Sequence, residues 1–186
     1  MNERTAMKFK DKVVLVTGAS RGIGAGIAHA FAAEGATVVV NHVSNAAAAA
    51  EVVAQCQAAG GDAWAVKADV GSALAVQAMV DEIVRETGRI DVVVNNAFRP
   101  YAFDPERRTL FDDIAWPDYQ AQFDGAVGGA FHVCRAVLPQ FRQRAQGCIV
   151  NIVSDLVERP VVPYHAYTTA TVSYTHLRAH ETRHDL

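Results

Sequence analysis

The sequence predicts an α/β fold in which one parallel sheet carries helices on both of its faces. Short β-branched runs alternate with longer stretches whose apolar residues recur at helical spacing, and this alternation yields five strands. A glycine-rich turn also joins the first predicted strand to the first predicted helix. Because successive parallel strands need crossover helices, the pattern favours a doubly wound sheet with strand order 3-2-1-4-5.

The first two strands are apolar runs bounded by turn residues. Val13–Val16 is a β-branched run before a tight turn, which indicates a buried strand. Apolar residues then recur at helical spacing over 22–34, and Gly35 is expected to end that helix. Thr37–Val40 is predicted to be a second buried strand.

An alanine-rich helix and a third strand follow. The composition of 44–59 favours a helix, and Ser44 is expected to cap it. Ala63–Lys67 is the third predicted strand. A further helix is predicted over 72–87, with Ser72 as its cap and Gly88 at its end. Its apolar side is expected to consist of Leu74, Val76, Met79, Val80 and Ile83.

The second half of the chain supplies two more strands and one long helix. Strands are predicted at Asp91–Asn95 and Cys148–Val153, and 97–115 is predicted to be a loop. Pro117 suits the first turn of a helix that is expected to run unbroken to Arg144. With no later strand predicted, the fifth strand should be a sheet edge, and the apolar faces of strands four and five should be exposed.

Composition restricts the classes of function. The chain has 186 residues, 51% of them hydrophobic, which allows one domain with a packed core. Its net charge of −3 gives no basic field for nucleic acid or an anionic membrane, and no apolar run could span a bilayer. The polar start indicates a soluble, cytoplasmic protein without a signal peptide. Cys56, Cys134 and Cys148 form no disulfide or metal pattern and are expected to be buried.

The turn after the first strand reads Thr17-Gly18-Ala-Ser-Arg-Gly22-Ile-Gly24. Gly18 allows a tight turn, Gly22 lets the backbone approach a pyrophosphate, and Gly24 lets helix and sheet pack closely. The free N–H groups at the helix start would then face the phosphates. A purely structural turn is the alternative. The residues of this turn that we expect to bind a dinucleotide are Gly18, Ser20, Arg21, Gly22, Ile23 and Gly24.

Charge at the end of the second strand predicts the choice of cofactor. An NAD site usually has a carboxylate there, which binds the ribose hydroxyls. This chain has Asn41 and His42 instead, and no Asp or Glu lies between Glu34 and Glu51. The Arg21 guanidinium could bind a 2′-phosphate, although it could also be a solvated surface group. We therefore predict NADP as the cofactor, with Asn41 and His42 among its contacts.

The turn motif Thr-Gly-x-x-x-Gly-x-Gly, together with Asn95-Asn96-Ala97 after the fourth strand, resembles the short-chain dehydrogenase/reductase family. The most similar group is the beta-ketoacyl carrier-protein reductases. The resemblance covers about residues 9–171 and implies a Rossmann-type sheet. Three further segments fit the same family: Ala68-Asp69-Val70, Ala136-Val137-Leu138-Pro139 and Ile149-Val-Asn-Ile-Val-Ser154.

The resemblance also implies roles for residues on the cofactor. Asp69 and Val70 would line the adenine, and Asn96 and Ala97 would lie beside the nicotinamide ribose. Phe98 stands where the family has glycine. It could reshape the floor of the pocket or be ordinary variation.

The family reduces carbonyl compounds by hydride transfer, and the resemblance assigns the catalytic positions. Ser154 matches the serine that holds the carbonyl oxygen, and Tyr167 matches the tyrosine that donates the proton. The lysine that lowers the pKa of this tyrosine is replaced by Thr171, and the relay asparagine by Ala126. We expect an NADPH-dependent oxidoreductase that acts on a small carbonyl or alcohol substrate, with little activity in this chain. Relatives form homo-oligomers. A nucleotide-binding protein without catalysis is the alternative.

The last fifteen residues, 172–186, differ from the family pattern and resemble translated read-through of a sequencing adapter. We expect them to be a non-native tail after an NADP-binding Rossmann domain over 1–171, and a junction there could have turned a lysine codon into Thr171. The tail contains His180-Glu181-Thr-Arg-His184, which has the zinc-protease spacing. A zinc hydrolase is a remote alternative, and no metal site is predicted.

Overall fold

The computed structural model describes residues 7–99, 109–154 and 164–173. Its five strands form one parallel sheet in the order β3-β2-β1-β4-β5, which confirms the predicted fold class and strand order. The strands are β1 (Val13–Val16), β2 (Thr37–His42), β3 (Asp62–Lys67), β4 (Val92–Asn95) and β5 (Cys148–Asn151).

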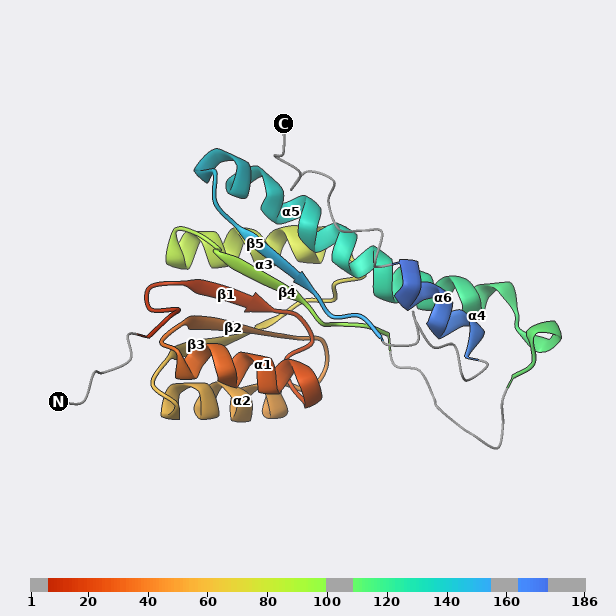
Figure 1. Ribbon diagram of the computed structural model, residues 1–186, viewed down its shortest axis with the longest axis horizontal. Helices are drawn as coiled ribbons and strands as arrows, with labels where there is room; N and C mark the ends of the chain where they lie inside the picture. The colour runs from red at the N-terminus through yellow and green to blue at the C-terminus, as the bar shows by residue number, and fades with distance from the viewer. Residues whose placement is uncertain (1–6, 100–108, 155–163, 174–186) are drawn as a thin grey trace.

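Helices cover both faces of this sheet (Figure 1). α1 (Gly22–Ala33) and α2 (Ala46–Ala58) lie on one face, and α3 (Ala73–Thr87) and α5 (Gly129–Arg144) lie on the other. Alternate strand residues serve the two cores. Leu15 packs with residues of α3 and α5, whereas its neighbours in β1 pack with α1 and α2. Because such a strand is buried on both faces, its sequence is a continuous apolar run.

Most helix ends lie where glycine or serine residues predict them. Gly35, two residues after the end of α1, and Gly88, directly after α3, take positive φ angles of 84° and 77°. Ser72 accepts a hydrogen bond from the N–H of Ala75 at 3.3 Å, as a cap should. The predicted cap of α2 is wrong, because the side chain of Asn45, not Ser44, accepts from the helix at 3.0 Å.

The prediction that Leu74 belongs to the apolar side of α3 is wrong, because this residue is 85% exposed. The buried residues of α3 are Val76, Met79, Val80 and Ile83. They follow helical spacing from Val76, and a residue two positions earlier points to the opposite side of the helix. Leu74 therefore faces solvent at the first turn.

The predicted long helix over 117–144 is divided into three parts. These are α4 (Trp116–Phe123), a π-helical segment η2 (Asp124–Gly128) and α5. Close packing explains the glycines at the break: a Cβ on Gly129 would lie 2.8 Å from Val70 Cγ2, and a Cβ on Gly125 would overlap Arg99. The interrupted helix thus lets the segments after β3 and β4 approach its backbone.

Two shorter elements complete the described structure. A 3₁₀ turn, η1 (Phe111–Asp113), lies within the predicted loop, and α6 (His165–Ser173) packs against α4 and η2. Residues 174–186, which make up most of the predicted tail, lie outside the described residues. Across the described ranges, no helix is long and apolar enough to cross a membrane.

The edge strand β5 is shorter than predicted and half exposed. Within the described part of the chain it pairs only with β4, and Val150 is 37% exposed. The expectation that β4 is exposed as well is wrong, because every residue of β4 is buried between β1, β5 and the helices. Cys148 is exposed at the start of β5, and Cys134 is only partly buried, so only Cys56 meets the expected burial.

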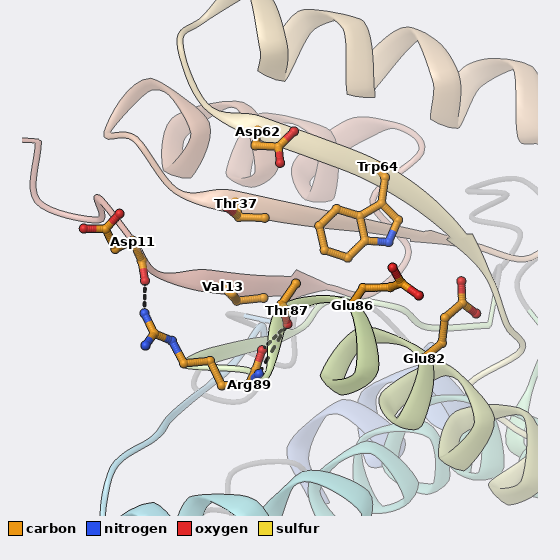
Figure 2. A pocket seen from close by; sticks show the side chains of 9 residues that line it. All are labelled: Asp11, Val13, Thr37, Asp62, Trp64, Glu82, Glu86, Thr87 and Arg89. Carbon is orange, nitrogen blue, oxygen red and sulfur yellow. Dashed lines mark hydrogen bonds between the residues drawn. The ribbon is translucent and has the colours of Figure 1, made fainter.

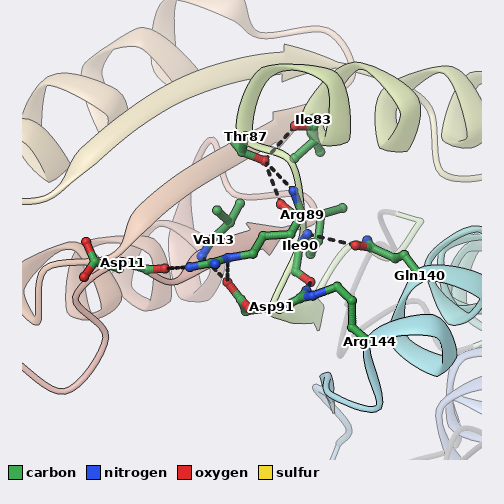
Figure 3. A network of polar contacts seen from close by, with 9 residues as sticks. All are labelled: Asp11, Val13, Ile83, Thr87, Arg89, Ile90, Asp91, Gln140 and Arg144. Atoms are coloured by element: carbon green, nitrogen blue, oxygen red, sulfur yellow. Dashed lines mark hydrogen bonds and ion pairs between the residues drawn. The ribbon is translucent and has the colours of Figure 1, made fainter.

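A buried carboxylate joins three elements at the amino edge of the sheet (Figure 3). Asp91 Oδ2 accepts hydrogen bonds from the Val13 N–H at 2.9 Å and from Arg89 Nε at 3.0 Å. Asp91 Oδ1 accepts from Arg144 Nη2 at 2.7 Å, and Arg144 Nη1 donates to the Ile90 carbonyl at 2.9 Å. The start of β1, the segment before β4 and the end of α5 are therefore held by one side chain that is 4% exposed.

Two opposing effects act on the pKa of Asp91. Burial raises this pKa, while the hydrogen bonds from Val13 and Arg144 and the charges of Arg89 and Arg144 lower it, with a net lowering. A carboxyl whose folded pKa is depressed stabilises the protein above its unfolded pKa of about 3.9. This stabilisation is lost as the pH falls through the folded pKa.

We predict that Asp91→Ala lowers the free energy of unfolding by about 3–5 kcal/mol, because it leaves two arginines without their buried partner. Urea unfolding at neutral pH measures this loss. The exposed Asp81, which accepts a hydrogen bond from Gln77 Nε2, is the matched control, and Asp81→Ala should change stability by about 0.5 kcal/mol or less. Asp91→Asn should also show a shallower loss of stability below about pH 4 than the unchanged chain. An equal loss in both chains would contradict the ion-pair account.

Candidate functional site

The glycine turn lies at the carboxyl edge of the sheet, against the segment that follows β4. Gly18 has a positive φ of 62°, and its N–H donates to Asn41 Oδ1 at 3.1 Å. A Cβ on Gly18 would lie 2.9 Å from the Cα of Ala97. Only glycine therefore suits this position, on grounds of both conformation and space.

The other two glycines of the motif have different surroundings. A Cβ on Gly24 would lie 2.5 Å from Asn96 Nδ2 and 2.8 Å from the Gly18 carbonyl oxygen. Gly24 thus lets α1 pack directly on the end of the sheet. Gly22 has a φ of 57° and open space where a Cβ would be, so its backbone is accessible from outside.

Thr17 and Asn96 connect the ends of β1 and β4. The Thr17 hydroxyl donates to the Val94 carbonyl at 3.2 Å and accepts from the N–H groups of Asn96 and Ala97, each at 3.0 Å. Asn96 Nδ2 donates to the Thr17 carbonyl at 2.9 Å. This role of Thr17 was not predicted; its signal in the sequence is a hydroxyl residue directly between an apolar strand and Gly18. These bonds place the turn and the Asn96-Ala97 segment side by side.

Asn41 and His42 end β2 with different side-chain environments. Asn41 is fully buried: its Oδ1 accepts from Gly18, and its Nδ2 donates to the Ala68 carbonyl at 2.9 Å. Its amide therefore positions the turn. His42 is 6% exposed, and its Nδ1 has no hydrogen-bond partner among the described residues.

The start of α1 is exposed and uncapped. Its N-cap residue, Arg21, is exposed in an extended conformation and makes no side-chain capping hydrogen bond in the described structure, and the first turn carries no acidic residue. Ser20 is half-buried and Ile23 is 68% exposed. By contrast, side chains cap α2 and α3. The first N–H groups of α1 are thus available to an anion.

The two residues expected at the adenine lie after β3. Asp69 is exposed, and its Oδ1 accepts from the Gly71 N–H at 2.8 Å. Val70 is 7% exposed and packs in the core on the α3 and α5 face. Its carbonyl oxygen lies 3.0 Å from His132 Nδ1 of α5.

The two expected catalytic residues lie beyond the carboxyl end of the sheet. Ser154 follows β5, and Tyr167 lies in α6; both side chains are half-buried and both have interaction partners. The ring of Phe98, which stands at the family's glycine position, meets the Tyr167 ring edge-on with centroids 6.3 Å apart. Through this ring contact, Phe98 connects the segment after β4 to Tyr167, the expected catalytic residue.

The Thr171 hydroxyl is bonded within its own helix, and Ala126 has apolar surroundings. Thr171 is 8% exposed, and its hydroxyl donates to the carbonyl oxygens of Tyr167 at 3.0 Å and Thr168 at 3.1 Å. Ala126 lies in η2 and packs against Ala170 of α6. Within the described residues, α6 carries no lysine or arginine. The position beside Tyr167 therefore has no fixed positive charge from its own helix.

Two cavities lie away from the glycine turn. The larger, about 700 Å³, opens at the amino edge of the sheet, where Val13, Thr37 and Asp62 begin their strands (Figure 2). It is therefore at the opposite edge from the predicted dinucleotide site. The smaller, about 310 Å³, is lined by Arg99, Asp118 and other residues of the segment after β4, α4 and α6.

The tail motif with zinc-protease spacing, His180, Glu181 and His184, lies outside the described residues. Over the ranges that the structure does describe, no group of three or more His, Cys, Asp or Glu side chains could hold a metal ion.

Comparison with known proteins identifies the family. The model of the short chain dehydrogenase family matches residues 12–185. The chain belongs to the short-chain dehydrogenase family. Among its relatives, an uncharacterized oxidoreductase of Methylorubrum extorquens is 39% identical over 164 residues, covering 88% of this chain and 62% of the relative. A 3-oxoacyl-[acyl-carrier-protein] reductase of Synechocystis is 41% identical over 143 residues, covering 77% of this chain and 56% of the relative.

Solved structures of dehydrogenases are also similar. An NAD⁺-bound xylitol dehydrogenase is 34% identical with a TM-score of 0.82, covering 91% of this chain and 63% of its own. A 7α-hydroxysteroid dehydrogenase with NADH and 7-oxo glycochenodeoxycholic acid is 31% identical with a TM-score of 0.81, covering 95% and 66%. The chain thus spans about three fifths of the length of the curated short-chain dehydrogenases named here. These relatives are oxidoreductases and not hydrolases.

We predict that Gly24→Ala destabilises the protein by about 1–3 kcal/mol, because the added methyl group overlaps Asn96 and the Gly18 carbonyl. Gly26→Ala is the matched control in the same helix, where a Cβ meets nothing within 4 Å. It should stabilise the protein by about 0.5–1 kcal/mol. Thermal unfolding of the two variants measures both effects, and equal changes would contradict the close approach at Gly24.

Proposed function

We propose that this protein is an NADPH-dependent oxidoreductase that transfers a hydride between NADP and a small keto or hydroxy compound. The observation that carries the proposal is the glycine turn, which packs closely on the sheet at Gly18 and Gly24 and is open at Gly22. This arrangement presents the uncapped start of α1 to an anion. Family membership supports a redox reaction.

The residues at the carboxyl edge fit a dinucleotide. The backbone at Gly22 and the first N–H groups of α1 would bind the pyrophosphate. Asp69 and Val70 would lie at the adenine, and the segment Asn96-Ala97, which Thr17 holds beside the turn, would lie at the nicotinamide ribose. When bound, the cofactor supplies or accepts the hydride.

Charge supports NADP over NAD. The exposed guanidinium of Arg21 can form charge-assisted hydrogen bonds with a 2′-phosphate. No carboxylate stands at the end of β2 to bind the ribose hydroxyls or to repel that phosphate. Two of the similar solved structures hold NAD⁺ or NADH, so this chain would differ from them in the group that it selects.

At the reacting carbonyl, Ser154 would donate a hydrogen bond to the oxygen, and the Tyr167 hydroxyl would donate the proton. Thr171 adds no cation to favour the phenolate, so proton transfer near neutral pH should be slow. The substrate would be a small carbonyl or alcohol compound handled in the cytoplasm. The exposed aromatic residues Phe111, Trp116 and Phe123 around α4 support a homo-oligomer.

A nucleotide-binding protein without catalysis is the second candidate. It is favoured by the hydroxyl of Thr171, which is bonded back to the helix backbone, and by Ala126 at the relay position. In this case the dinucleotide would bind and no carbonyl reduction would follow.

We predict that the chain binds NADPH more tightly than NADH and that Arg21→Gln weakens NADPH binding by about 10-fold or more, because it removes a charged hydrogen bond. NADH binding should be unchanged. Fluorescence titration of both cofactors measures the two affinities, and Arg85→Gln, which changes an exposed arginine of α3, is the control. Tighter binding of NADH by the unchanged chain would refute the cofactor choice.

We also predict slow reduction of small ketones by the chain, and loss of the remaining rate by about 10²-fold or more in Tyr167→Phe, because the proton donor is gone. NADPH binding should persist in this variant. Tyr119→Phe is the control. It removes a hydroxyl from an exposed hydrogen bond with Thr169 and should leave the rate unchanged. NADPH binding with no turnover above that of Tyr167→Phe would favour the protein without catalysis.

A further inference from the structure

The larger cavity lies between the amino ends of the strands and α3 (Figure 2). Its volume of about 700 Å³ falls within the range of about 300–1,000 Å³ that is typical of pockets for small molecules. Thr37 and Asp62 line it from the starts of β2 and β3, and Glu82 and Glu86 line it from α3. The cavity is at the opposite edge from the glycine turn, and the proposed function gives it no role.

Trp64 gives the cavity an aromatic wall. This residue of β3 is half-buried, and part of its side chain packs against the core on the α3 face of the sheet. The rest of its surface borders the cavity, where Figure 2 shows the indole between the strands and the side chains of Glu82 and Glu86. Indole is the aromatic group that attracts a cation most strongly to its face. One wall can therefore contact both the apolar part and the positive charge of a ligand.

The charged groups of the cavity are mostly acidic, and its arginine is already bonded elsewhere. The charged residues among its lining are Asp11, Asp62, Glu82, Glu86 and Arg89. Arg89 Nε donates to Asp91, and Nη2 donates to the backbone carbonyl of Asp11. The positive charge of Arg89 is thus matched by Asp91, and the four carboxylates of the cavity are left without a cation of their own among the lining residues.

The two carboxylates of α3 illustrate this imbalance. Glu82 and Glu86 are four residues apart, so they lie on the same side of the helix, where like charges repel. Glu86 bonds to the exposed Arg85 beside it at 3.2 Å. Glu82 is half-buried, and its carboxylate has no hydrogen bond or ion pair with another described residue. A cation in the cavity would give Glu82 a partner and reduce the repulsion.

We propose that this cavity binds a linear aliphatic polyamine. One ammonium group lies over the Trp64 indole beside Glu82 and Glu86, and another lies at Asp62, across the cavity. A chain of methylene groups with separated charges suits carboxylates that come from two walls. A metal ion does not suit them, because no three His, Cys, Asp or Glu side chains of the described residues are placed to hold one. The inference does not need a bound dinucleotide.

The first experiment measures the affinity for spermidine by calorimetry at low salt. Trp64→Leu, which keeps an apolar side chain, should weaken binding by about 3- to 10-fold through loss of the cation–π contact. Glu82→Gln should weaken it by about 2- to 5-fold through loss of one charge. Glu51→Gln is the matched control, because Glu51 is an exposed carboxylate of α2 on the other face of the sheet. It should leave the affinity unchanged.

A second measurement uses the unchanged chain and does not depend on the folding of a variant. The chain has two tryptophans, Trp64 and Trp116, whose indole N–H signals are followed by NMR during a titration with spermidine. Trp116→Phe assigns the two signals. The Trp64 signal should shift to a plateau, and the signal of Trp116 in α4 should stay in place. The uncharged diol 1,8-octanediol, which has a similar chain, should shift neither.

Three outcomes would overturn the inference. A Trp64 signal that does not move with spermidine would show that the cavity is not the binding site. Equal losses of affinity in Glu82→Gln and Glu51→Gln would indicate diffuse attraction to a protein of negative net charge. A shift of the Trp64 signal by the diol equal to that by spermidine would show that the cavity does not select a cation. All three titrations omit the dinucleotide, so each of these results leaves the proposed function standing.

Discussion

The buried carboxylate of Asp91 is the interaction on which the geometry of the sheet depends. It bonds to the first residue of β1 and to arginines before β4 and at the end of α5, so it sets how these three elements meet at the amino edge. The parallel register then determines the other end, where Thr17 meets Asn96. A slip of one residue between β1 and β4 would turn every side chain of the shifted strand to the opposite face of the sheet. It would also separate the Thr17 hydroxyl from its partners. The register set at the far edge and the local bonds of Asn41 and Asn96 thus position the glycine turn together.

The two edges of the sheet differ in how their charged groups are matched. At the amino edge, buried charges are matched: Asp91 has three donors, and the Gln140 side-chain oxygen and Arg144 bond to the backbone of Ile90. A buried ion pair stabilises a fold only when its remaining hydrogen-bonding capacity is met, and this one approaches that condition. At the carboxyl edge, α1 is uncapped and His42 Nδ1 lacks a partner in the described structure. Gln140 Nε2 at the amino edge also has no partner among the described residues, so the two edges differ in their charged groups and not in their unpaired polar atoms.

The sequence predicted what local patterns determine. β-branched runs predicted the five strands, and glycine and serine predicted most helix ends, because these signals lie within a few residues of their effect. The strand order followed from the alternation of strands and crossover helices. The π-helical segment Asp124–Gly128 was missed, since apolar spacing along a helix hardly changes over one wider turn. The partners of Asp91 lie as far as 78 positions away, and only the fold brings them together. Asn41 was assigned to the cofactor by the lack of a carboxylate, but its burial and hydrogen bonds are tertiary features that place it under the turn.

The adenosine and catalytic ends of the proposed site differ in charge. At the adenosine end, the exposed Arg21 precedes α1, and the exposed Lys67 is the register partner of His42 in the sheet. Beside Tyr167, the corresponding position is a threonine whose hydroxyl is bonded to its own helix and whose neighbour Ala170 packs against η2. Charge at one end acts on binding of the dinucleotide, whereas charge at the other acts on the ionisation of the phenol. These two energies are independent, since the groups that supply them lie on different elements. A chain with this distribution of charge can hold a dinucleotide firmly while transferring protons slowly, and its affinity for the cofactor is therefore no measure of its rate.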